Sequence, residues 1–170
     1  EMKNKYNVTA EKYYYQQNYA KVIAIYEPLY LAEKSEKFYY LGDGQSAFHL
    51  AYAYQQTDQQ DKASTLVTKL EQRLLKQKQR QVNNPDYYYQ MAQVKSLQDK
   101  KSDALYFMQG AINVGWVRAW QAELEPVFDN IAKEDRFAQM MGGVKARLTT
   151  MRTSLEAVDE FSLDDNGETF

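Results

Sequence analysis

Small residues recur along this chain at a fixed interval. Ala10, Ala51 and Ala92 follow one another at a spacing of 41 residues. Two further sets of apolar residues keep the same spacing of 41 residues. They are Val22, Ala63 and Ala104, and Leu29, Leu70 and Ala111. Small side chains allow two helices to cross closely, and larger apolar side chains fill the space between neighbouring helix pairs. The spacing therefore predicts an all-α array of helical hairpins, a fold that works by recognition on its surface.

Composition excludes several functions for this chain. Its 170 residues are enough to bury one core, and the absence of cysteine removes disulfides, zinc–thiolate sites and thiol nucleophiles. The net charge of −2 creates no field that would attract nucleic acid. No stretch reaches the roughly 20 apolar residues of a membrane span. We expect no nucleic-acid binding, no membrane insertion, no metal or other cofactor and, without a phosphate loop or nucleophile elbow, no enzymatic activity.

The chain divides into three predicted repeat units, at about residues 3–35, 45–81 and 85–115. In the first, Pro28 predicts a kink or an end of the second helix near Ile25. In the second, residues 61–81 read as one long helix. The third opens with an N-cap and a proline at 84–85 and stops at a glycine, Gly115. Residues 38–44 form the connector between the first two units.

Residues 116–152 are expected to form a cap on the open end of the array. The last helix begins near Asp135, and its apolar residues fall at helical intervals: Phe137, Met140, Met141, Val144, Leu148 and Met151. Four aromatic residues are expected in the core beneath this cap: Trp116, Trp120, Phe128 and Phe137. Lysine and arginine are absent after Arg152, so we expect residues 153–170 to be an acidic, disordered tail.

The repeat positions resemble those of the tetratricopeptide repeat over about residues 3–116. The second unit matches best, through Ala47, Leu50, Ala51, Tyr54, Ala63, Val67 and Leu70. The third matches through Tyr88, Met91, Ala92, Ala104, Met108 and Ala111, whereas Val22 departs from the small residue of the pattern in the first. The resemblance implies a right-handed α-solenoid of three helix pairs plus the capping helix.

The residues after the third unit resemble a second pattern. Gly115-Trp116, Pro126-Val127-Phe128-Asp129 and Asp135-Arg136-Phe137 are similar to the end of repeat domains in multidomain bacterial signalling proteins, winged-helix transcription regulators among them. This likeness implies that the chain is a sensory or docking part and that an output domain precedes Glu1. The compartment stays open between cytoplasm and periplasm.

In the tetratricopeptide family the first helices of successive repeats line a concave groove. The residues placed there by the resemblance are Asn7, Glu11, Tyr14, Gln45, Phe48, Tyr52, Gln55, Tyr89 and Gln93. Amides pair with peptide backbone, and tyrosine offers a large contact area with few rotamers to fix. We therefore expect a peptide or protein partner in this groove. Two alternatives stay open: the tyrosines only pack between helices, or the chain is a ligand-sensing effector domain of a bacterial transcription regulator, working through curvature or as a homodimer.

Three other candidate sites are weaker. One subtype of the family binds a terminal carboxylate with basic and amide residues at fixed positions. In this chain those positions hold Glu11, His49, Asp86 and Gln90, none of them a lysine or arginine. His49, the only histidine, is either a pH sensor or a packing residue, and it has no second ligand at metal spacing. The basic stretch at 69–80 is interrupted by Glu71 and glutamines, which favours a solvated helix face over a phosphate site.

Overall fold

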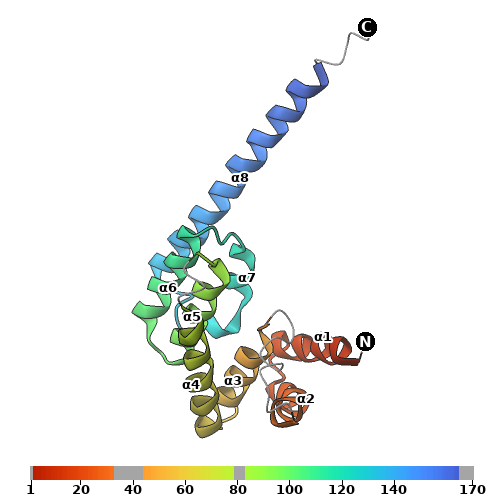
Figure 1. The fold of residues 1–170 in the computed structure, drawn as a ribbon, viewed down its shortest axis with the longest axis vertical. Helices are drawn as coiled ribbons and strands as arrows, with labels where there is room; N and C mark the ends of the chain where they lie inside the picture. The colour runs from red at the N-terminus through yellow and green to blue at the C-terminus, as the bar shows by residue number, and fades with distance from the viewer. Residues whose placement is uncertain (1, 33–43, 79–82, 165–170) are drawn as a thin grey trace.

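The computed structural model describes residues 2–32, 44–78 and 83–164, and within them the side chains of 8–32, 44–78 and 83–156. This part of the chain contains helices and no strands, so the predicted all-α class is confirmed (Figure 1). The helices are α1 (Met2–Tyr15), α2 (Tyr19–Ala32), α3 (Ser46–Gln56), α4 (Gln60–Gln77), α5 (Pro85–Leu97), α6 (Lys101–Asn113), α7 (Ala119–Leu124), a 3-10 helix (Pro126–Phe128) and α8 (Asp135–Asp164). No helix among these residues has the length and apolar character that crossing a membrane requires.

The first six helices form three hairpins whose turns are built alike. Gln17, Asp58 and Asp99 lie 41 residues apart and take positive φ values of 58°, 57° and 54°. After each, a backbone N–H donates to the carbonyl five residues earlier at 2.9 Å, as in the bond from Asn18 N to Tyr13 O. The predicted turns are therefore present in all three units. Right-handed winding of the hairpins stays a prediction.

The recurring alanines lie where these helices cross. Ala10, Ala51 and Ala92 are fully buried, and the later set, Val22, Ala63 and Ala104, is buried with them. α3 packs on both α2 and α4, and α5 packs on both α4 and α6. Burial at these positions is what the 41-residue spacing predicts, because a larger side chain there would push neighbouring helices apart.

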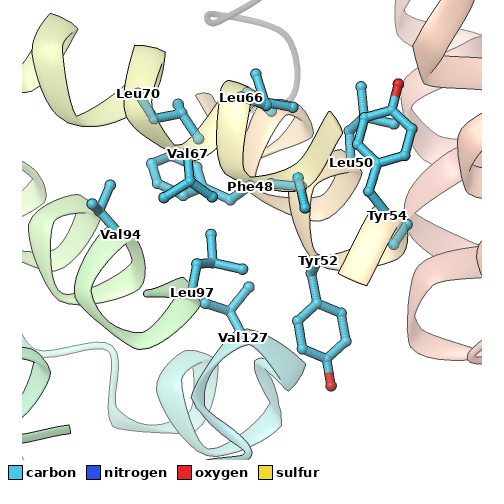
Figure 2. Packing of buried hydrophobic residues seen from close by; sticks show 14 of the residues in the cluster. Phe48, Leu50, Tyr52, Tyr54, Leu66, Val67, Leu70, Val94, Leu97 and Val127 are labelled. Carbon is cyan, nitrogen blue, oxygen red and sulfur yellow. The ribbon is translucent and has the colours of Figure 1, made fainter. Parts of the chain in front are cut away.

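Apolar side chains from separate hairpins meet in one core. Figure 2 shows Phe48 of α3 and Val67 of α4 directed toward Val94 and Leu97 of α5, with Val127 of the 3-10 helix beside Leu97. A second cluster joins α5 and α6 to α7 and the first turns of α8. The C-terminal part of the chain is therefore packed onto the repeats.

Two helices run further than the sequence predicts. α2 does not end near Ile25 but continues through Pro28 to Ala32. The carbonyl left without a donor belongs to Ala24, an exposed residue, so water can satisfy it. α8 continues past Arg152 to Asp164, into the segment for which composition predicts disorder. Helix-forming residues such as Leu155 and Glu156 favour this extension, and Arg152 pairs with Glu156 one turn later.

One core prediction is wrong, and a few others fall outside the described residues. Trp116, Phe128 and Phe137 are buried beneath the cap as expected, but Trp120 is 64 % exposed. The six-residue helix α7 turns Ala119 and Ala122 inward, which leaves Trp120 on the solvent side. Residues 33–35, 38–43, 79–81 and 165–170 of the predicted units, connector and tail lie outside the described part of the chain.

The repeated turns give a test of backbone strain. Asp58 is exposed and holds a left-handed conformation that non-glycine residues adopt at a cost. Asp58→Gly is therefore expected to raise the free energy of unfolding by about 0.5 kcal/mol. Urea unfolding followed by circular dichroism measures the change. Gln72→Gly, at an exposed helical position of α4, is the control and should lower the free energy of unfolding by about 0.5 kcal/mol. Equal effects of the two substitutions would show that the backbone at Asp58 is not strained.

Candidate binding site

The predicted groove residues come together on the inner helices, but most of them are covered. Tyr14, Phe48 and Gln93 are fully buried, and Tyr52 and Tyr89 are nearly so. Gln45 is also buried, whereas Glu11 and Gln55 are half-buried. The side chain of Asn7 lies outside the described part of the structure. The element that covers Tyr14 and Tyr52 is formed by residues 125–130, which we call the return segment.

The first helix of each hairpin, which we call an inner helix (α1, α3 and α5), donates one hydroxyl hydrogen bond to the return segment. The Tyr14 hydroxyl of α1 donates to Glu125 Oε1 at 2.6 Å. The Tyr52 hydroxyl of α3 donates to Asp129 Oδ2 at 2.8 Å, and the Ser96 hydroxyl of α5 donates to the Val127 carbonyl at 2.6 Å. A peptide that contacted Tyr14 or Tyr52 along their hydroxyl groups would have to displace these bonds.

Glu125 is the buried charge at the centre of this contact. Its side chain is fully buried, and Oε2 lies 3.5 Å from Nε2 of His49. The His49 ring stacks on Tyr14, with centroids 3.9 Å apart and planes 18° apart. Burial by itself raises the pKa of Glu125, but the nearby imidazole of His49 and the hydrogen bonds from Tyr14 and the Val127 N–H together hold that pKa below its usual range. His49 thus packs and pairs inside the protein, while burial and Glu125 raise the pKa of Tyr14 and keep its hydroxyl a donor.

A polar pocket of about 460 Å³ remains beside the return segment. It lies at the N-terminal ends of α3 and α5 and against α7, and we call it the amide pocket. Its lining residues are Gln45, Asp86, Tyr89, Gln90, Arg118 and Gln121. Arg118 and Asp86 form an ion pair with each other, so the lining carries no net charge.

Two polar atoms of the amide pocket are buried without a hydrogen-bond partner in the described structure. They are the hydroxyl oxygen of Tyr89 and Oε1 of Gln121. Burial is the main cause that raises the pKa of Tyr89, so its hydroxyl keeps a proton to donate. Behind them, Gln93 Nε2 donates to Gln45 Oε1 at 2.6 Å, which leaves Oε1 of Gln93 unpaired as well. Buried polar groups in proteins are nearly always paired, so this pocket suits an occupant with both donors and acceptors.

Two other pockets have polar groups that already bond to one another. One, of about 210 Å³, lies at the opposite ends of α3 and α5, where Gln55 Nε2 donates to the Leu97 carbonyl at 2.7 Å. The other, of about 630 Å³, lies between α2 and α4, where Glu27 accepts from both Tyr54 and Lys62 at 2.8 Å. Neither has an unpaired group that calls for a ligand. The unpaired atoms of Tyr89 and Gln121 make the amide pocket the candidate site.

The sequence places Gln45 and Tyr89 in the predicted groove, but it does not identify Gln121 or Arg118. Both follow the third unit, in a stretch without helical periodicity, and no local signal indicates that they face α3 and α5. Among the described residues no group of three or more His, Asp or Glu side chains is arranged to hold a metal ion. Comparisons of the chain with protein-family models, curated proteins and solved structures found no match.

The buried carboxylate gives a pH-dependent test. Because the pKa of Glu125 is lower in the folded state than in the unfolded chain, where it is about 4.3, its pairing stabilises the fold above that pH and is lost as the pH falls below it. Glu125→Gln should therefore lower the free energy of unfolding by about 2–4 kcal/mol near pH 6 and by less at pH 3. Urea unfolding at both pH values measures this difference.

Glu156→Gln is the matched control, because Glu156 lies on the exposed part of α8. It should change the free energy of unfolding by less than about 0.5 kcal/mol at either pH. A Glu125→Gln variant as stable as the wild type near pH 6 would show that the buried pair does not support the fold.

Proposed function

We propose that this chain is a tetratricopeptide-type binding module that holds a polar segment of a partner protein in the amide pocket. The observation that carries the proposal is the pair of unpaired, buried atoms, Tyr89 Oη and Gln121 Oε1. A buried polar group without a partner costs about 1–3 kcal/mol. A ligand that bonds to both atoms would remove this cost.

The lining favours an uncharged segment that can both donate and accept. Gln45, Gln90 and Gln121 present amide groups, which match the N–H and carbonyl groups of a peptide backbone or of asparagine and glutamine side chains. Arg118 and Asp86 neutralise each other at the wall of the pocket. A segment with several charges of one sign would lose hydration without gaining an opposite charge.

The size of the pocket supports a second candidate function. Its volume of about 460 Å³ lies in the range of sites for small molecules, about 300–1,000 Å³. A ligand-sensing effector domain of a bacterial transcription regulator would use the same residues for a small polar compound. The two functions differ in the ligand and not in the position of the site.

Tyr89→Phe tests the site with little change in packing. It removes the hydroxyl but keeps the ring, which stacks on Trp116 at a centroid distance of 5.1 Å. With the chain immobilised as bait and captured proteins identified by mass spectrometry, the affinity for a specific partner should fall about five- to tenfold. Tyr106→Phe, on an exposed tyrosine of α6, should leave capture unchanged. Equal capture by wild type, Tyr89→Phe and a Gln121→Leu variant would remove the pocket from the proposal.

A thermal-shift screen with small polar compounds separates the two candidates. A compound that raises the melting temperature of the wild type and not of Tyr89→Phe would favour the sensor function. No such compound, together with Tyr89-dependent capture of a partner, would favour the protein-binding module.

A further inference from the structure

Helix α8 carries an apolar stripe that continues beyond the body of the protein. Its residues alternate in steps of four and three positions: Phe137, Met141, Val144, Leu148, Met151, Leu155 and Val158. The first three are buried against α6 and α7. The next three, Leu148, Met151 and Leu155, are 39 %, 53 % and 67 % exposed. Alternating steps of four and three are the heptad pattern of a coiled coil, which keeps one seam facing a partner helix over several turns.

The exposed part of α8 has little packing within its own chain, apart from an exposed ion pair between Lys145 and Glu123 of α7. Every described residue from Lys145 to Glu156 is exposed, and Figure 1 shows this part of the helix extending away from the other helices. Four hydroxyl residues at 149, 150, 153 and 154 lower its helix propensity, and each bonds to the carbonyl four residues earlier. This part of the helix lacks the tertiary packing from which most helical stability in proteins comes. A partner helix along the seam would supply the missing stability.

The charges along α8 indicate what that partner is. The charged residues that flank the start of the exposed seam are all basic, namely Lys145, Arg147 and Arg152. From Glu156 onward the sequence of the helix contains acidic residues and no basic ones. Two copies running in opposite directions would place the basic half of each helix beside the acidic half of the other. In a parallel pair, Arg147 would instead face Arg152 of the second copy, with like charges at the flanking positions.

We infer that two copies of this chain associate through an antiparallel coiled coil formed by the part of α8 beyond Val144. The seam consists of Leu148, Met151 and Leu155, continued in the sequence by Val158. This interface is separate from the amide pocket, because none of the seam residues lines that pocket. Its small apolar area makes the dimer dependent on protein concentration.

The oligomeric state of the full 170-residue chain tests the inference. Sedimentation equilibrium between about 5 and 200 µM should show a shift from monomer to dimer. Met151→Glu should weaken the dimer at least about tenfold by placing a charge in the seam. Thr150→Glu, beside it on a face away from the seam, should leave the dimer intact. A monomer throughout this range, or a dimer unaffected by Met151→Glu, would overturn the inference.

The melting curve of each variant serves as a folding control. Met151 lies outside the packed body, so Met151→Glu should retain the helical signal of the repeats and its main unfolding transition. Loss of that transition would show that Met151 belongs to the core of the monomer, and would overturn the inference that the seam is available to a second copy.

Charge reversal tests the orientation. The double variant Arg147→Glu with Arg152→Glu places acidic residues along both halves of α8, so an antiparallel dimer should weaken by about tenfold at low salt. In a parallel dimer the variant would exchange facing arginines for facing glutamates, so the like-charge repulsion would remain and the association should stay nearly unchanged. Unchanged or tighter association would contradict the antiparallel arrangement.

Discussion

The buried carboxylate of Glu125 connects parts of the chain that the repeats alone would leave apart. In an ordinary repeat array each unit contacts only its neighbours, and stability is close to a sum of local terms. Here a hydrogen bond joins Tyr14 of the first hairpin to Glu125, 111 residues later, and His49 of the second hairpin approaches the same group. A buried charge is tolerated only with its partners in place, so the two hairpins and the return segment depend on one another.

This contact also determines which tyrosine hydroxyl groups of the inner face already have a hydrogen-bond partner. The return segment covers Tyr14 and Tyr52 and satisfies their hydroxyl groups. Tyr89 is buried at the N-terminal ends of the inner helices, where the return segment offers it no hydrogen-bond partner. In the proposed function, recognition is therefore confined to a pocket of a few residues instead of an extended groove. Repeat positions in the sequence do not show that Tyr14 and Tyr52 have hydrogen-bond partners in the return segment while Tyr89 has none.

Local patterns in the sequence predict the hairpins but not the contacts of the C-terminal part. The alanine spacing, the three turns and the N-cap at Asn84, whose side chain accepts from the Asp86 N–H at 2.9 Å, follow from helical periodicity and turn chemistry. The exposure of Trp120 depends on which side of a six-residue helix faces the core, and so short a segment has no periodicity to show it. The return segment is determined by hydrogen bonds across long sequence separations, which no local pattern contains.

Helix α7 is the structural element between the amide pocket and α8. Gln121 of α7 lines the pocket, while Ala119 and Ala122 pack in the same apolar cluster as Met141 and Val144 of α8. The bond between Glu123 and Lys145, at 2.7 Å, is exposed and contributes little by itself. The position of α7 therefore depends on apolar burial, which holds it against α8 whether or not the pocket is filled. Leu148, Met151 and Leu155 lie beyond that cluster. Loss of the contacts along the seam would therefore leave Gln121 in place, so the pocket and the seam are physically independent surfaces.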